Sequence, residues 1–183
     1  MPWGLKRYQQ SRQSHFVTFC CYRRRQLFAS AESKDIFESA LERVRRVYRF
    51  SVYGYVVMPE HVHLLVSEPE KGTLAEALKS LKQGVSRRLI GGGEHFWQKR
   101  YYDHNVRNYD KFREKLRYIH RNPVQRGLCA EPGDWSWTSF RHYATGCEGR
   151  VEIESEWTAN RRERAGGRMC PAIPLPHSSQ NRA

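Results

Sequence analysis

The sequence lacks the cysteine patterns of disulfide-rich secreted domains and of zinc-binding modules. Its five cysteines are odd in number, none is spaced as C-x-x-C, and Cys20 and Cys21 are adjacent. Such a pattern excludes a disulfide framework and a zinc finger. It is typical of proteins in a reducing compartment, so we expect a cytoplasmic protein.

Long hydrophobic runs are also missing. No stretch of the 183 residues approaches the length of a membrane-spanning helix, and the first ten residues, MPWGLKRYQQ, hold no apolar signal-peptide core. A chain of this length has room for one domain of ordinary size plus tails. We therefore expect one domain without a membrane association.

Acidic residues are few relative to basic ones. The chain has 19 Asp and Glu against 32 Lys and Arg, a formal net charge of +13. An excess of this size favours a polyanionic partner, most often nucleic acid, although a solvated basic surface is the simpler alternative. Aromatic residues make up 13% of the chain, which suits either base stacking or a packed core.

The first half of the chain predicts three strands and a helix. Residues 15–22 are rich in β-formers and predict a strand, and the apolar spacing after a possible N-cap at Ser33 predicts a helix up to Tyr48. Residues 50–58 and 61–66 predict a hairpin that turns at Pro59 and Glu60.

The second half predicts two more helices and a fourth strand. Thr73 and Glu76 form a capping-box pattern before a helix that should end at the glycines 91–93. Residues 96–108 should contain the fourth strand, and residues 109–121 form a helix stopped by Pro123.

The element order β-α-β-β-α-β predicts an α+β fold, a ferredoxin-like sandwich with an antiparallel sheet. The helix after the fourth strand is added at the C-terminal end of this sandwich. Two helices should cover one face of the sheet and leave the other face available. The composition then shifts towards Arg, Pro, Gly and Ser. We expect the domain to span residues 1–146, and residues 147–183 to be a basic, largely disordered tail, above all from about 159.

Two histidines stand two positions apart in the strand at 61–66. Side chains alternate along a strand, so His61 and His63 share one face while Val62, Leu64 and Val66 share the other. The aliphatic side is the natural one to lie under helices, which places both imidazoles on the open face, close enough to bind one metal ion. Two structural histidines remain the alternative, because His-x-His is a weak motif.

A tyrosine and an amide share one flank of the helix at 109–121. Phe112, Leu116 and Ile119 define its buried stripe at about 100° per residue. Tyr118 lies well off this stripe, and Asn122 follows four residues later on the same flank. The alternative is a tyrosine lying on the helix surface.

Four blocks of the sequence, MPEHVHLLV, FWQKRYYDHNVRN, YIHRNPVQRGL and DWSWTSF, occur in this order. They resemble the REP-associated tyrosine transposases, a branch of the single-tyrosine HUH (His-hydrophobic-His) transposases; REP stands for repetitive extragenic palindrome. The resemblance runs from about residue 15 to residue 143, and four separately placed blocks make it specific.

The resemblance implies a ferredoxin-like enzyme that cuts and rejoins single-stranded DNA. It implies that His61 and His63 bind the metal, that Asn122 completes the metal site, and that Tyr118 is the nucleophile that forms a 5′-phosphotyrosine. The implied substrates are imperfect REP hairpins, cut beside a short guide sequence at the hairpin foot. Whether such a protein is a monomer or a homodimer stays open.

These residue types suit the implied chemistry. A free tyrosine has a pKa of about 10, so it needs a more electrophilic phosphate, which a divalent ion supplies as a Lewis acid. Two imidazoles and an amide oxygen are neutral ligands that leave the charge of Mg²⁺ or Mn²⁺ uncancelled. A phosphotyrosine conserves the bond energy, so a 3′-hydroxyl reverses the cut without ATP.

Further residues are candidates for DNA binding. Trp97, Arg100 and Tyr101 on the expected fourth strand suit base stacking and phosphate neutralisation, unless the rings only fill the core. The run Arg23, Arg24 and Arg25 suits the phosphates of a duplex stem, unless it is a merely solvated loop.

Two other functions compete with strand transfer. One is a non-catalytic protein that binds single-stranded DNA or RNA on a basic sheet. The other is a metal-assisted phosphoesterase without a covalent step, which needs a general base near the histidines. Glu60 is the only nearby candidate for that base.

Overall fold

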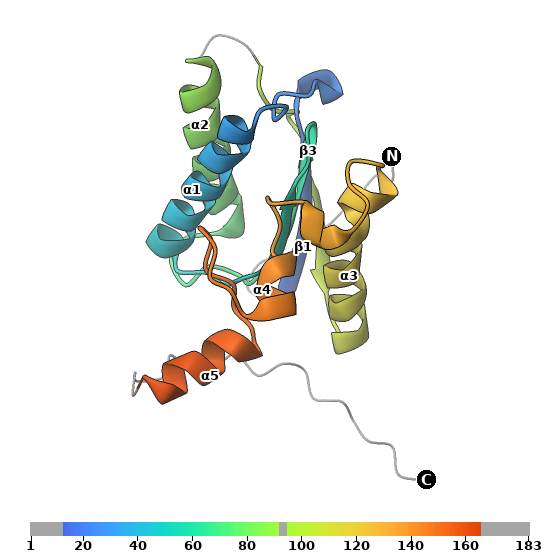
Figure 1. Ribbon diagram of the computed structural model, residues 1–183. Helices are drawn as coiled ribbons and strands as arrows, with labels where there is room; N and C mark the ends of the chain where they lie inside the picture. Colours follow the sequence, from blue (N-terminus) through green and yellow to red (C-terminus); the bar gives the residue numbers. More distant parts are fainter. Residues whose placement is uncertain (1–12, 92–94, 166–183) are drawn as a thin grey trace.

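The computed structural model describes residues 13–91 and 95–165, which build an antiparallel sheet with helices on both faces (Figure 1). Its four strands are β1 (Ser14–Cys20), β2 (Val52–Val57), β3 (His61–Val66) and β4 (Tyr102–Val106). Their order across the sheet is β2-β3-β1-β4, and every neighbouring pair is antiparallel. The predicted ferredoxin-like sandwich is confirmed, with β4 as an edge strand.

The long helices divide between the two faces of the sheet. Helices α1 (Ala31–Tyr48) and α2 (Leu74–Ile90) form one layer, and α3 (Tyr109–Gln125) lies on the opposite side (Figure 1). The shorter elements are η1 (Tyr22–Arg24), η2 (Pro132–Asp134), α4 (Phe140–Thr145) and α5 (Glu156–Arg164). None of the helices in the described ranges combines the length and the apolar composition that crossing a membrane requires.

Local capping explains where the helices begin. Thr73 and Glu76 form both hydrogen bonds of the predicted capping box at α2. At α1 the N-cap is Ser30 and not Ser33, because the Ser30 side chain accepts a hydrogen bond from the Ser33 amide. The Ser33 hydroxyl instead donates to the Ser30 carbonyl from inside the first turn. The prediction was therefore off by three residues.

Two separate hydrophobic clusters hold the three layers together. The larger lies between the sheet and α1 and α2 and includes Val62, Leu64 and Val66. The smaller lies between the sheet and α3 and includes Leu65 and Ile119, with other members at Phe16, Val56, Met58 and Val106. The buried stripe predicted for α3 is confirmed, since Phe112 and Leu116 pack against this smaller cluster. The second sheet face is therefore covered in part by α3 rather than left open.

Helix α3 continues past Pro123, contrary to the prediction that this proline stops it. Pro123 has no N–H to donate to a carbonyl in the preceding turn, which costs one helical bond. The helix nevertheless continues beyond it, since the Arg126 amide donates to the Asn122 carbonyl at 3.0 Å and the Leu128 amide donates to the Pro123 carbonyl at 2.9 Å. Asn122 and Arg126 consequently stay on one rigid helix end.

Part of the expected tail belongs to the folded domain. Val151 and Ile153 are 1% and 4% exposed, and Ile153 forms a parallel bridge with Val52 of β2. Ion pairs join the same segment to α1, between Arg45 and Glu152 and between Arg150 and Asp35. The expectation that a disordered tail begins at 147, or at about 159, is wrong for residues 147–165, and residues 166–183 lie outside the described residues.

Candidate active site

The two histidines of β3 share one face of the sheet, as the alternation of the strand predicted, but that face is turned towards α3 and is not open. His61 and His63 are each 5% exposed, while Val62 and Leu64 between and beside them are fully buried under α1 and α2. The His63 ring stacks on Phe16 of the neighbouring strand β1, with ring centroids 5.5 Å apart. The His63 imidazole is therefore fixed by the sheet itself.

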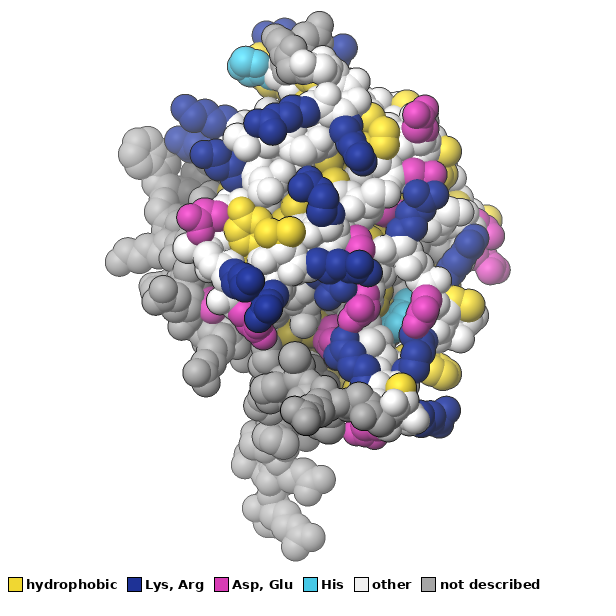
Figure 2. All heavy atoms as spheres, turned by 90° about the vertical axis from the view of Figure 1, so that its left-hand side faces the viewer, with side chains coloured by type: hydrophobic (Ala, Val, Ile, Leu, Met, Phe, Trp, Pro, Cys, Tyr) yellow, Lys and Arg dark blue, Asp and Glu magenta, His cyan; other side chains and the backbone are white. Residues whose placement is uncertain are grey.

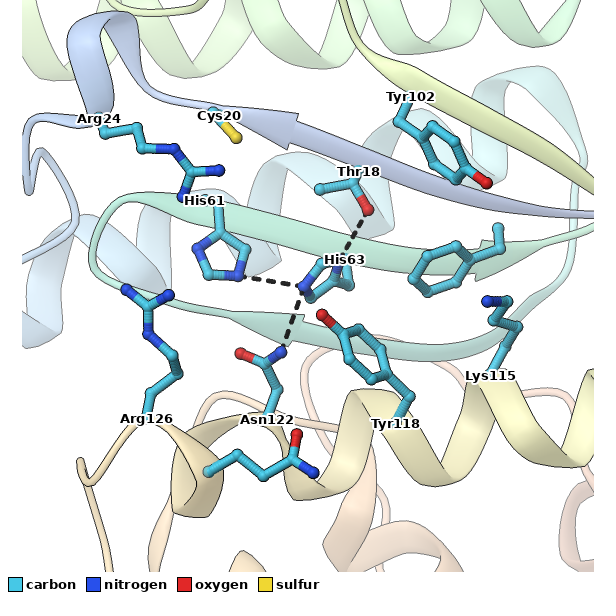
Figure 3. A pocket seen from close by; sticks show the side chains of 12 residues that line it. Thr18, Cys20, Arg24, His61, His63, Tyr102, Lys115, Tyr118, Asn122 and Arg126 are labelled. Atoms are coloured by element: carbon cyan, nitrogen blue, oxygen red, sulfur yellow. Dashed lines mark hydrogen bonds between the residues drawn. The ribbon is translucent and has the colours of Figure 1, made fainter. Parts of the chain in front are cut away.

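Each imidazole is held through its Nδ1 atom. His61 Nδ1 lies 3.0 Å from a Glu60 carboxylate oxygen, and His63 Nδ1 lies 2.7 Å from the Thr18 hydroxyl. The two Nε2 atoms lie 3.1 Å apart (Figure 3). A carboxylate accepts only from a protonated nitrogen, so this arrangement assigns the proton of His61 to Nδ1 and leaves a lone pair on its Nε2.

Burial keeps both histidines neutral. It lowers the pKa of His61 and lowers the pKa of His63 to about 3, in the latter case reinforced by His61 and the nearby cation Lys115. A neutral imidazole is the form that binds a metal ion. Burial therefore favours, in both rings, the neutral form that a metal site needs.

Asn122 of α3 completes a set of three possible metal ligands. Its side chain is buried, and its Nδ2 lies 3.4 Å from His63 Nε2. Its Oδ1 has no hydrogen-bond partner among the described residues. Because an amide oxygen and nitrogen are exchanged by a half-turn of the group, that orphaned oxygen is readily directed at the histidine nitrogens.

The donor set fits one divalent cation. Metal–imidazole bonds are about 2.1 Å long, so two nitrogens bound at a right angle lie about 3 Å apart, close to the separation of the Nε2 atoms. Within the described ranges no group of three or more His, Cys, Asp or Glu side chains could hold a metal. The fit rests instead on two imidazoles and one amide oxygen.

Tyr118 extends from α3 beside Asn122 towards His63 (Figure 3). Its ring centroid is 5.2 Å from the His63 ring and 6.0 Å from the Phe16 ring, both in edge-to-face contact. The side chain is nevertheless 42% exposed. The phenol is therefore positioned by aromatic contacts beside the histidines and open to a substrate at the same time.

A cleft of about 460 Å³ surrounds these groups. It is lined by Phe16, Thr18, Cys20, Arg24, His61, His63, Tyr102, Lys115, Tyr118, Asn122, Gln125 and Arg126. Three of these are cations and none is acidic. The cleft is thus suited to an anion that reaches the tyrosine and the histidines together.

A comparison with known families identifies the kind of protein that carries this site. Residues 8–122 match the family described as "Transposase IS200 like". The chain belongs to the IS200-like transposase family. The matched residues end at Asn122 and include the histidines and Tyr118.

Individual relatives support the resemblance to REP-associated tyrosine transposases. The chain is 28% identical over 107 residues to the "REP-associated tyrosine transposase" of Escherichia coli. This alignment covers 58% of this chain and 64% of that protein. It is 29% identical over 117 residues to a "Putative REP-associated tyrosine transposase" of Haemophilus influenzae, which covers 57% of this chain and 66% of that protein. The alignments therefore span less than two thirds of either relative.

A solved structure shows the same fold. It is described as "Structure of the REP associates tyrosine transposase bound to a REP hairpin", and it is 25% identical to this chain with a TM-score of 0.69. The match covers 84% of this chain and 93% of that one. The shared architecture thus extends over most of this IS200-like transposase.

The Glu60 carboxylate is already bonded to two side chains and is not a free general base. It is 2.7 Å from an Arg126 guanidinium nitrogen and also bonds His61, and the residue is only 7% exposed. Arg126 stands at the end of α3, so the Glu60 carboxylate ties the histidine strand to the helix of Tyr118. This engagement disfavours the phosphoesterase alternative.

Only one of the three consecutive arginines reaches the cleft. Arg24 lines it, whereas Arg23 and Arg25 are exposed outside it, Arg23 over the Tyr22 ring at 5.3 Å. Arg23 and Arg24 both have positive φ, 52° and 54°, in the tight bend after β1.

Trp97, Arg100 and Tyr101 do not lie on the fourth strand, because β4 begins only at Tyr102. Trp97 and Tyr101 pack against the larger cluster on the α1 and α2 side, with Trp97 5.0 Å from the Phe19 ring. Arg100 is exposed before the strand. The prediction that these three residues lie on the fourth strand is therefore wrong.

The sequence interpretation missed Thr18, Lys115 and Arg126. Thr18 faces His63 through the β1–β3 register, which the sequence does not reveal. Lys115, three residues before Tyr118, lies over the Phe16 ring at 5.0 Å. The spacing of Lys115, Tyr118 and Asn122 along one helix flank was the available signal for that lysine.

Proposed function

We propose that this chain is a metal-dependent endonuclease and strand transferase that acts on single-stranded DNA at REP-type hairpins through a 5′-phosphotyrosine at Tyr118. The observation that carries the proposal is the convergence of Tyr118, Asn122 and the paired Nε2 atoms of His61 and His63 in one cationic cleft. A hairpin substrate is suggested by the solved structure with a bound REP hairpin.

His61, His63 and Asn122 would hold a single Mg²⁺ or Mn²⁺ ion. When bound, that ion supplies Lewis-acid activation of the scissile phosphate. Because the three ligands are neutral, they leave its positive charge uncancelled. Glu60 and Thr18 fix the ring orientation of the two histidines, as carboxylate and hydroxyl partners do in metal sites.

Tyr118 carries the covalent step. Its oxygen attacks the phosphorus as the phenolic proton leaves, and the P–O3′ bond breaks. The departing 3′-oxygen takes up a proton and becomes a hydroxyl, while the 5′-phosphate remains esterified to the tyrosine. Attack by a 3′-hydroxyl on this ester restores a phosphodiester and frees the phenol, so joining is the reverse of cutting.

The cations of the cleft hold the strand. Arg24 and Arg126 lie near His61, and Lys115 lies near Tyr118 (Figure 3). Backbone phosphates on both sides of the cut would thus meet a positive charge, which positions the strand without reading its sequence.

A trapped adduct tests this function. A hairpin oligonucleotide labelled on the 3′ side of its cut is incubated with protein and Mn²⁺, and covalent product is detected on a denaturing gel. We expect a labelled protein band whose peptide map places the nucleotide on Tyr118. Hairpin binding without any adduct would support the non-catalytic DNA-binding alternative and contradict the proposal.

A further inference from the structure

A second cleft lies on the opposite side of the sheet from Tyr118. It is a groove of about 500 Å³ between α2 and the segment 97–101 that precedes β4. Its charged and aromatic walls are formed by Lys79, Lys82, Arg87, Lys99, Trp97 and Tyr101. Figure 2 shows Lys and Arg side chains spread over the face that α1 and α2 form. The active-site chemistry makes no use of this groove.

The cations of this α2 groove have two different roles. Lys82 is half-buried, donates to the Gln98 carbonyl at 3.1 Å, and lies about 6 Å from the Trp97 and Tyr101 rings, so it braces the groove wall. Lys79, Arg87 and Lys99 are exposed, and no salt bridge within the described part of the chain involves them. Among the described residues that line the groove, none is acidic. Three cations are therefore available to an anionic ligand.

The edge of the sheet separates the α2 groove from the active-site cleft. Tyr101 lines the groove and the next residue, Tyr102, lines the cleft, since successive side chains point to opposite faces where a strand begins. β4, which starts at Tyr102, is the edge strand. The Gln98 amide also donates to the carbonyl of Cys20, another residue of the cleft, at 2.9 Å. A chain leaving the cleft over this edge meets the groove next.

We propose that the α2 groove binds single-stranded DNA that continues from the strand held beside Tyr118 and passes around the edge of β4. This inference rests on the proposed function, because that function places DNA in the cleft. Exposed cations beside aromatic rings, without carboxylates, match the phosphodiester backbone and bases of a single strand. The net charge of +13 gives the same complementarity for the whole molecule.

Equilibrium binding in EDTA tests the groove apart from the chemistry. The variant Lys79→Ala with Lys99→Ala removes two exposed groove cations and spares Lys82 and the rings. The matched control, Lys71→Ala with Arg164→Ala, removes two exposed cations that do not line the groove. Each protein is titrated with a short hairpin that ends a few nucleotides beyond the cut site, so that the scissile phosphodiester is present. The same hairpin extended further by single-stranded DNA, on one side or the other, is titrated in parallel.

Wild-type protein should bind one of the extended hairpins more tightly than the short one. The groove variant should bind that extended hairpin about tenfold more weakly than wild-type protein does. The slope of log affinity against log salt concentration should become shallower by about 1.4, because each phosphate contact on a single strand contributes about 0.7. The control variant should keep both. The proposal would be overturned if the groove variant lost as much affinity for the short hairpin as for the extended one, or if the control variant lost as much affinity as the groove variant. It would also be overturned if neither extension increased the affinity of wild-type protein.

Photocrosslinking provides an independent outcome. A 5-bromodeoxyuridine placed along the extension should attach to the peptide that contains Trp97 and Tyr101. Crosslinks confined to other peptides would overturn the proposal. Adduct formation on the short hairpin reports on Tyr118 alone, so failure of the groove and failure of the proposed function are distinguishable.

Discussion

The Nε2 atoms of His61 and His63 face each other at 3.1 Å while both Nδ1 atoms are engaged by the protein. Two buried imidazoles that only filled space would more simply hydrogen-bond to separate partners. Here the sheet and its neighbours direct two nitrogens at one point, beside an amide of α3 and an exposed phenol.

The first prediction concerns the nucleophile. Tyr118→Phe removes one oxygen and leaves the edge-to-face contacts with His63 and Phe16 possible, so the fold and hairpin binding should be retained. The covalent adduct should vanish, because no other group at that position forms the phosphate ester. The measurement is adduct yield beside hairpin affinity. Tyr102, which also lines the cleft, is the control: Tyr102→Phe should still form the adduct. An adduct in the Tyr118→Phe protein would show that another residue is the nucleophile.

The second prediction concerns metal binding. His61→Ala or His63→Ala should weaken Mn²⁺ binding at least tenfold and abolish cleavage, because each change removes one ligand nitrogen. Hairpin affinity should change only a few-fold, since Lys and Arg contacts to phosphates dominate it. EDTA should reproduce the loss of cleavage, and Mn²⁺ should rescue single variants better than Mg²⁺. Asn122→Ala should weaken the metal less than either histidine variant.

Isothermal titration with Mn²⁺ measures this directly, and His95→Ala is the matched control, because His95 is exposed and does not line the cleft. Cleavage by wild-type protein freed of divalent ions would contradict the proposed metal dependence.

The third prediction concerns Glu60. Glu60→Gln keeps a hydrogen-bond acceptor near His61 but removes the charge that bonds both His61 and Arg126. Loss of such a carboxylate partner typically costs 10–100-fold in metal affinity or activity, and we expect about tenfold weaker Mn²⁺ binding. Glu32→Gln, at an exposed position in the first turn of α1, is the control. Unchanged Mn²⁺ affinity in the Glu60 variant would exclude a positioning role.

The fourth prediction concerns stability and pH. Burial raises the pKa of Glu38 to about 7, although the Tyr55 hydroxyl donates to it at 2.7 Å. The folded state therefore binds this proton more tightly than the unfolded state, where the pKa is near 4.5. The resulting stabilisation is present below about pH 4.5 and is lost as pH rises through 7, by up to about 3 kcal/mol.

Glu38→Gln should remove that part of the pH dependence, because an amide does not titrate in this range. Urea unfolding at pH 5.5 and pH 8 measures it, as the difference between the two proteins. His15 also titrates differently in the folded state: burial lowers its pKa, but Asp103 and Glu68 raise it by more. Because His15 is present in both proteins, its contribution to the pH dependence cancels in the difference. The same pH dependence in both proteins would show that Glu38 is ionised when folded.

Much of the site was accessible from the sequence because it depends on local periodicity. Strand alternation alone places His61 and His63 on one face and the aliphatic residues between them on the other. Helix geometry alone separates Tyr118 and Asn122 from the buried stripe of α3. The capping box at Thr73 likewise needs only residues within one turn.

The tertiary structure decided everything that depends on contacts between distant segments. Strand register places Thr18 opposite His63, and the packing of α3 on the second face brings Asn122 to the histidines and Arg126 to Glu60. The chain also bends before β4, which places Trp97 and Tyr101 on the side of the sheet that α1 and α2 cover. Burial of Val151 and Ile153 attaches the segment after residue 146 to the core. Periodicity fixes which residues share a face, but only the packing of whole elements fixes which faces meet.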